Sequence, residues 1–338
     1  MNHPEPDIKM VQSLNFPISA QSIASHGGWA ALAEHLRALG IDGVEGIWDP
    51  EEADETFPAE MLTGCHLIFW PDWLDFYRRN EPELIRKFGS LDILGKIYPG
   101  PKPEDLVEAY RRDLQRAIRY GAKYVVFHVS DVSQEETWTY KWLHDDYAVL
   151  DASLEIINEI LKGVEPTFEF LVENQWWPGF TFTEPRKTEY LLDRINFSHA
   201  GIMLDTGHVM NTNPALRSQE EGAENILQKY RAHGQLRRAV RGLHFHQSVS
   251  GDYVRGHVGT YPDCVPRDYF EGFSANYAHV QRIDRHDPWT VPEAGLVVHE
   301  IAPKYLTHEL ANKERCPQLE ATRRQMAAIR KGYELLKG

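Results

Sequence analysis

The chain of 338 residues is 42% hydrophobic and 25% charged, which is the composition of an ordinary globular protein. Its formal net charge of −14 repels nucleic acid and anionic membranes on average, so we expect neither as a partner. The cysteines Cys65, Cys264 and Cys316 form no pair motif, which predicts no disulfide framework. The segment MNHPEPDIKM lacks the apolar core of a signal peptide, and no apolar run has the length of a membrane span. We therefore expect a cytoplasmic protein.

Short apolar or β-branched runs alternate with longer amphipathic segments along the chain. In chain order, WAALAEHLRALG ends on Gly40, a natural helix C-cap, and PEDLVEAYRRDLQRAIRYGA begins with a proline and ends at Gly121. The segments DYAVLDASLEIINEILKG and QLEATRRQMAAIRKGYELLK keep the same helical period. The short runs that we predict to be strands are residues 13–19, 43–48, 65–70, 123–130, 168–174, 201–206, 240–248 and 295–301.

Strands that alternate with helices predict a parallel sheet, and eight such units in a chain of this length favour a closed barrel. No G-x-G-x-x-G turn follows the first strand, which disfavours a dinucleotide-binding fold. We therefore predict an α/β fold of the (β/α)8 TIM-barrel type, with outer helices, as a single domain over residues 1–338. An insertion at about 248–292 is long for a connection in this fold, which predicts a lid or a contact within a homo-oligomer.

Active sites in such barrels form at the carboxyl ends of the strands. Taken singly, a polar residue there has an ordinary interpretation as a helix cap, an Asx-turn or a core histidine. Together at one mouth, several buried carboxylates would repel one another unless they were protonated or bound to a cation. The cluster therefore favours a divalent metal ion, Mn, Co, Zn or Mg. The candidates at the predicted strand ends are His66, His128, Glu173, Asp205, His208, His244, His246 and Glu300.

These strand ends resemble the xylose isomerase-like TIM barrels, a superfamily that includes sugar (phosphate) isomerases and epimerases, inosose dehydratases and endonuclease IV. The resemblance rests on a glutamate at the fifth strand, LDTGH at the sixth, HFH at the seventh and a glutamate at the eighth. It implies that His208 binds substrate or ligates a second metal, and that His66 and His128 can join further ions. The metal quartet that it implies is Glu173, Asp205, His246 and Glu300, with His244 as the alternative in the seventh strand.

The same resemblance implies a metal-dependent isomerase or epimerase that acts on a sugar, sugar phosphate or related polyol through a metal-stabilised enediolate. Its catalytic residues would be Glu173, Glu300 and His208. Three alternatives stay open: an inosose-type dehydratase at the same site, an endonuclease IV-like phosphodiester hydrolase, and a non-catalytic metal- or sugar-binding barrel. The hydrolase is disfavoured because its pattern places an Asp-x-His pair shortly after the seventh strand, where this chain reads VSGDYVRGH.

Aromatic and basic residues near the predicted mouth are candidates for contacts with a carbohydrate substrate. Aromatic rings can stack on sugars and exclude water, which favours Trp70, Trp176 and Trp177. Packing of long loops or a subunit contact is the alternative interpretation of these tryptophans. Arg255 and Lys304 are candidates to bind a phosphate, so a phosphorylated and an unphosphorylated substrate both stay open.

Overall fold

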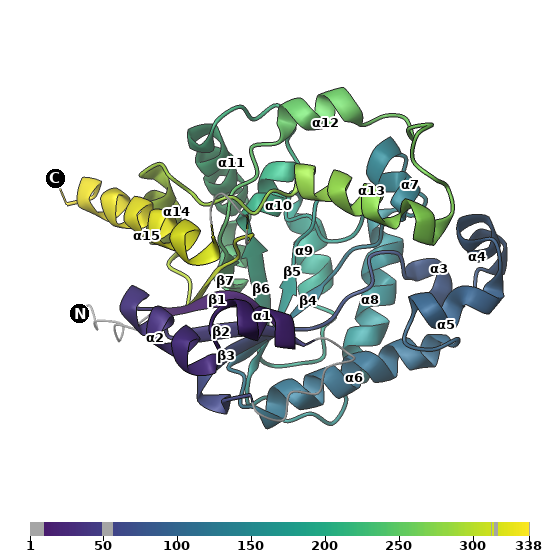
Figure 1. Cartoon of the computed structure of the whole chain (residues 1–338), viewed down its shortest axis with the longest axis horizontal. Coiled ribbons are helices and arrows are strands. Elements are labelled where there is room, and N and C mark those ends of the chain that lie inside the picture. Colours follow the sequence, from purple (N-terminus) through teal and green to yellow (C-terminus); the bar gives the residue numbers. More distant parts are fainter. Residues whose placement is uncertain (1–9, 49–56, 312, 314–316, 338) are drawn as a thin grey trace.

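A computed structural model describes residues 10–48, 57–311, 313 and 317–337. Eight parallel strands close a barrel in chain order, and helices surround it (Figure 1), which confirms the predicted (β/α)8 TIM barrel. The strands are β1 (Val11–Ile18), β2 (Gly43–Trp48), β3 (Leu62–His66), β4 (Tyr124–His128), β5 (Glu169–Glu173), β6 (Ala200–Asp205), β7 (Val240–His244) and β8 (Tyr305–His308).

The helices form the outer layer and the connections at the barrel ends. The long amphipathic segments of the sequence become α2, α6, α8 and α15, and Gly40 ends α2 in the left-handed conformation that favours glycine. The helices are α1 (Ala20–Ser25), α2 (Trp29–Leu39), α3 (Leu74–Tyr77), α4 (Glu81–Phe88), α5 (Leu94–Ile97), α6 (Pro103–Arg119), α7 (Gln134–Thr139), α8 (Asp146–Ile160), α9 (Pro185–Leu192), α10 (Thr206–Asn211), α11 (Gln219–Ala232), α12 (Gly251–His257), α13 (Tyr269–Ile283), α14 (Glu293–Ile301) and α15 (Gln318–Leu335).

The strands are buried on both faces, as a parallel barrel requires. In β4, the consecutive residues Val125, Val126 and Phe127 are all buried, so the strand reads as a continuous apolar run. Within the described part of the chain, no helix combines the length and the apolar character needed to cross a membrane. Cys65 and Cys264 are free thiols, and Cys316 lies outside the described residues.

The eighth strand lies in a different segment from the one predicted. Residues 295–301 belong to helix α14, where the buried Ala294, Val297, Val298 and Ile301 recur at helical spacing. A Cβ at Gly295 would lie 2.4 Å from the backbone oxygen of Ile329 in α15, so this glycine lets the two helices pack closely. The strand itself is the short buried segment YLTH, which pairs with β1 and β7.

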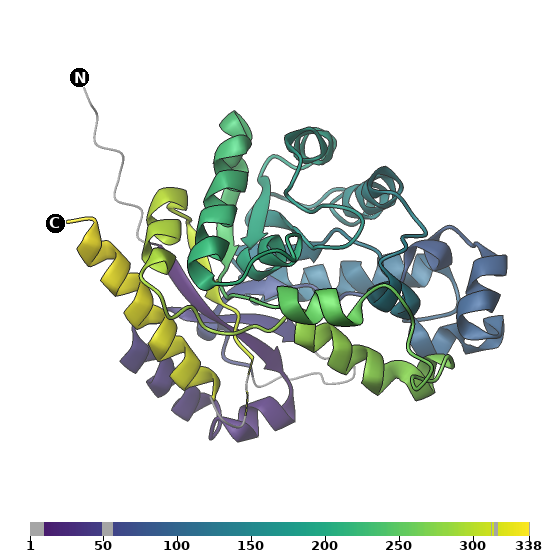
Figure 2. The same cartoon turned by 90° about the horizontal axis from the view of Figure 1, so that it is seen from above.

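The connection between β7 and β8 carries α12 and α13 before it reaches α14. Figure 1 shows α12 and α13 at the end of the barrel toward which β6 points, close to α10. In the views of both Figure 1 and Figure 2, one end of α13 lies beside the segment that runs from α3 to α5. The contact is direct, because the ring centroids of Tyr269 in α13 and Phe88 in α4 are 5.1 Å apart. The connection therefore forms one wall of the barrel mouth.

Candidate metal centre

The carboxyl ends of the strands and the β7–β8 connection bring three groups of potential metal ligands into one region. In each group, the ligand atoms lie within 4.8 Å of one another. Glu173, at the end of β5, belongs to two of them. The first group is His66, His128 and Glu173; the second is Glu173, Asp205, His244 and Glu309; the third is His208, His246, Asp284 and His286.

The first group presents two imidazole nitrogens and one carboxylate oxygen to a common point. His66 Nδ1 lies 2.8 Å from the carbonyl oxygen of Leu67, which can only accept a hydrogen bond. The proton of a neutral ring therefore sits on Nδ1, and Nε2 keeps its lone pair. That Nε2 lies 3.0 Å from His128 Nε2 and 3.3 Å from Glu173 Oε2. Burial opposes ionisation of Glu173, but His128 and His244 outweigh it and hold its pKa well below the usual range.

The second group contains two atoms that the protein leaves without a hydrogen bond. His244 Nε2 lies 2.9 Å from Glu45 Oε1, a contact in which the ring donates. The opposite nitrogen, Nδ1, lies 3.2 Å from Glu173 Oε2 and 3.0 Å from Glu309 Oε2. Although they are buried, His244 Nδ1 and Glu309 Oε2 have no hydrogen-bond partner among the described residues. A cation between them would satisfy both atoms.

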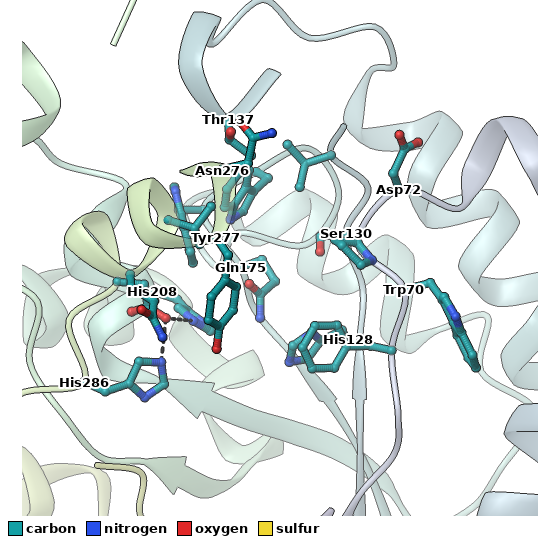
Figure 3. Close-up of a pocket in the computed structure, with 18 of the residues that line it drawn as sticks. Trp70, Asp72, His128, Ser130, Thr137, Gln175, His208, Asn276, Tyr277 and His286 are labelled. Carbon is teal, nitrogen blue, oxygen red and sulfur yellow. Dashed lines mark hydrogen bonds and ion pairs between the residues drawn. The ribbon is translucent and has the colours of Figure 1, made fainter. Parts of the chain in front are cut away.

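Two histidines of the third group, His208 and His286, lie close together at the cavity (Figure 3), and both contact Asp284. His208 Nδ1 lies 2.9 Å from the carbonyl oxygen of Asn174, and His286 Nδ1 lies 3.1 Å from that of Glu309. Both rings therefore donate from Nδ1 and direct Nε2 toward Asp284 Oδ2, at 3.2 Å from His208 and 2.6 Å from His286. A lone pair that faces a carboxylate needs a proton or a metal ion between them.

The LDTGH segment links the second and third groups, because it contributes Asp205 to the second and His208 to the third. The backbone nitrogen of His208 donates to Asp205 Oδ1 at 2.6 Å, so Asp205 caps helix α10. The other oxygen, Asp205 Oδ2, lies 2.9 Å from His246 Nε2, which leaves the buried His246 Nδ1 without a partner among the described residues. A Cβ at Gly207 would lie 2.0 Å from His246 Cε1, so only glycine leaves room for this ring.

This set of donors fits divalent metal ions. Imidazole nitrogens and carboxylate oxygens are the ligands that Zn, Mn and Co accept in proteins. Second contacts on the far side of the His66, His208, His244 and His286 rings fix their orientation, as is usual for histidines that bind metal. An ion at these groups would also give a partner to the buried atoms His244 Nδ1, His246 Nδ1 and Glu309 Oε2.

One of the predicted metal ligands needs correction. Glu300 was expected at the end of a strand, but it lies on helix α14, where Arg231 Nε donates to its Oε1 at 2.7 Å. That placement was wrong because its segment is a helix, and Glu309, directly after β8, stands with Glu173 instead. His244, the last residue of β7, joins Glu173 and Glu309, whereas His246, two residues beyond the strand, belongs to the third group.

Of the residues predicted to contact substrate, three line the cavity and two do not. A cavity of about 810 Å³ opens above the ligand groups, and Trp70, Trp176 and Trp177 line it. Arg255 and Lys304 do not line this cavity, so their expected placement was wrong. Arg255 lies on α12 and pairs with Asp252, and Lys304 pairs with Glu169 at the amino end of β5.

Four residues of the centre were missed by the sequence analysis. Glu309 follows a strand of only four residues, which is too short to give a clear periodic signal. Asp284 and His286 form the Asp-x-His pair that was sought directly after the seventh strand, but α12 and α13 separate them from it. Glu45 lies inside β2, where a buried carboxylate has no local sequence signal.

Comparison with known proteins places this geometry in a family. Residues 33–289 match the family described as xylose isomerase-like TIM barrel. The chain belongs to this family. No curated protein matches it.

Three solved structures show how far the likeness to known xylose isomerase-like barrels extends. One is a xylose isomerase-like TIM barrel protein from Mycobacterium smegmatis in complex with magnesium, with 13% identity, a TM-score of 0.51 and coverage of 97% of this chain and 98% of that chain. Endonuclease IV from Thermus thermophilus gives 16% identity, a TM-score of 0.50 and coverage of 96% and 99%. The D-allulose 3-epimerase from Methylomonas sp. gives 12% identity, a TM-score of 0.50 and coverage of 97% and 97%. At these identities the likeness establishes the fold, and the chemistry has to come from the residues.

Proposed function

We propose that this xylose isomerase-like barrel is a metal-dependent hydrolase of phosphoesters that holds two or three divalent ions. The observation that carries the proposal is the presence of three ligand groups, two of which share Glu173. Enzymes that hydrolyse phosphoesters commonly use adjacent ions to hold the attacking and the departing oxygen. The isomerase that the sequence favoured needs an ion only in the second group, so two further groups of metal ligands are more than it requires.

Burying the polar residues of the first and third groups costs free energy of folding, which argues against a merely structural role for them. Asp284 lies close to two histidines, and His66 and His128 face each other through their Nε2 atoms at 3.0 Å. Burial of charged groups costs free energy even when they are paired with opposite charges. A chain that needed one ion would be more stable with apolar residues at these positions. Their presence therefore supports the binding of more than one ion.

When bound, the ions supply a Lewis acid and lower the pKa of water, which is the chemistry that attack on phosphorus requires. The chain supplies the positioning. Gln175 Nε2 donates to Glu173 Oε1 at 3.2 Å and fixes that carboxylate. Glu309 lines the cavity, where burial opposes its ionisation, but the charge of His244 outweighs burial and keeps the pKa of Glu309 well below its usual value. Glu309 is therefore ionised, which is the form in which a carboxylate ligates a divalent ion.

An isomerase or epimerase is the second candidate, and a specific observation favours it. Glu173, Asp205, His244 and Glu309 form a complete single-ion quartet, with Glu309 in the place expected for Glu300. Such a quartet can stabilise an enediolate, with the two glutamates available for proton transfer. The two candidates differ in whether the third group is needed.

The experiment compares both reactions in the metal-loaded protein and in two variants. Hydrolysis of p-nitrophenyl phosphate and of its diester is measured beside epimerisation of a panel of ketoses. Asp284→Asn removes a carboxylate from the third group, whereas Glu300→Gln makes the same charge change on the outer helix α14. The hydrolase proposal predicts phosphoester turnover that falls by a factor on the order of 100 in Asp284→Asn, and full turnover in Glu300→Gln.

Ketose turnover that survives Asp284→Asn, together with no phosphoester turnover, would refute the hydrolase and establish the second candidate. Equal losses in both variants would show that the change acts through the fold. Thermal unfolding of each variant separates that case from a specific effect on the centre.

A further inference from the structure

Helix α13 presents a row of aromatic side chains to the cavity above the ligand groups. Tyr269, Phe273 and Tyr277 are spaced four residues apart, so they lie on one face of the helix, and all three line the cavity. Phe273 is 50% exposed and Tyr277 is 55% exposed. Their rings lie 4° from parallel, with centroids 6.1 Å apart. Exposed aromatic rings on one side of a cavity are typical of a binding surface.

A further aromatic residue of the cavity lining, Phe69, lies directly at the first ligand group. Phe69 follows β3, is 40% exposed and lies with its ring centroid 4.1 Å from that of His128. In the view of Figure 3, the Tyr277 ring lies between His208 and His286 on one side and His128 on the other. Phe69 and Tyr277 line the same cavity as His128 and His286, so a flat group beside these rings would lie close to the ligand groups.

The charges of the cavity fit a small substrate better than a nucleic-acid strand. Of the residues that the structure describes, the lysines and arginines that line the cavity are Arg282, Arg285 and Lys313. Arg285 and Lys313 are both paired with Asp287, at 2.7 Å and 2.6 Å. The guanidinium of Arg282 lies over the ring of Tyr253 at 4.2 Å. Proteins that follow a phosphate backbone need many more free cationic side chains, and the net charge here is −14.

We propose that the cavity binds a small phosphoester that carries a planar aromatic ring, such as an aryl group or a nucleobase. The phosphate lies at the ligand groups, and the ring stacks between Phe69 and the Phe273–Tyr277 pair of α13. This inference rests on the proposed hydrolase function. Stacking of a ring on an aromatic side chain strengthens binding by about 5-fold to 100-fold.

The test compares two phosphonates, which resist hydrolysis, in binding to the metal-loaded protein by calorimetry. Benzylphosphonate carries the ring and methylphosphonate lacks it. We expect benzylphosphonate to bind at least about tenfold more tightly, and Phe273→Ala to remove most of that preference. The matched control is Phe270→Ala on the same helix, because Phe270 is 49% exposed but lies outside the cavity lining. It should keep the full preference.

The outcomes separate this inference from the function on which it rests. Equal binding of the two phosphonates, or a preference that survives Phe273→Ala, would overturn the aromatic subsite and leave the hydrolase intact. Failure of both phosphonates to bind would count against the phosphoester function and thereby against the inference.

Discussion

Replacing Gly207 with alanine tests whether the His246 ring must stay where it lies. The added Cβ would lie 2.0 Å from His246 Cε1 and 2.4 Å from His246 Nδ1. Carbon atoms in ordinary contact are about 3.5 Å apart or more, so the ring would have to move by roughly 1.5 Å. It cannot move freely, because Asp205 holds its Nε2 at 2.9 Å and the ring stacks on His286 with centroids 4.1 Å apart.

Two opposing terms set the effect of Gly207→Ala on the free energy of unfolding. Overpacking of a buried position typically costs about 1–3 kcal/mol. Alanine in place of glycine in a helix offsets up to about 1 kcal/mol of that cost. With the full offset, we therefore expect a net loss of up to roughly 2 kcal/mol. Because His246 belongs to the third ligand group, the bound metal should also fall by about one ion per chain.

The assay is thermal unfolding together with metal content by elemental mass spectrometry. Gly256→Ala is the matched control, because Gly256 lies in helix α12 and an added Cβ there would meet nothing within 4 Å. That variant should keep its metal and gain up to about 1 kcal/mol of stability. If Gly207→Ala instead behaves like Gly256→Ala in both measurements, the arrangement of His246 described above is refuted.

Three further outcomes follow from the same contacts. Glu45→Gln weakens the hydrogen bond that orients His244, so metal affinity measured by competition with a chelator should fall about 10-fold to 100-fold; an unchanged affinity would contradict this role. Glu300→Ala breaks only a surface pair with Arg231, so metal content should stay constant and stability should change by less than about 1 kcal/mol. Burial lowers the pKa of His279 to about 4 from the ordinary 6.5, so the unfolded chain binds a proton at a higher pH than the folded chain does. The free energy of unfolding should therefore be constant above pH 6.5 and should fall by up to about 1.4 kcal/mol for each pH unit below it. In denaturant unfolding, His279→Gln should show a weaker dependence of this free energy on pH.

The barrel could be predicted because its elements are long and periodic, and because alternation of strands and helices permits few architectures. The eighth strand could not. The run GLVVHEI suits a buried strand or a buried helix equally, and the contact of Gly295 with Gly332 in α15, which decides for the helix, is tertiary. That one error moved the expected ligand from Glu309 to Glu300.

The centre was predictable where its residues sit at the ends of strands. Glu173, Asp205 and His208 follow apolar runs directly, and the structure brings them together. Asp284 and His286 reach the same place only after a connection of two helices, and no local pattern marks where that connection returns. Their distance from β7 in the sequence hides the Asp-x-His pair that an endonuclease IV-like pattern places shortly after the seventh strand.

The most direct test of the account is the metal content of the purified wild-type protein, measured per chain beside Asp284→Asn. We predict two to three divalent ions per chain in the wild type, and about one fewer in the variant, because Asp284 stands at the middle of the third ligand group. A single ion that Asp284→Asn leaves in place would contradict the multi-ion centre and with it the proposed hydrolysis of phosphoesters.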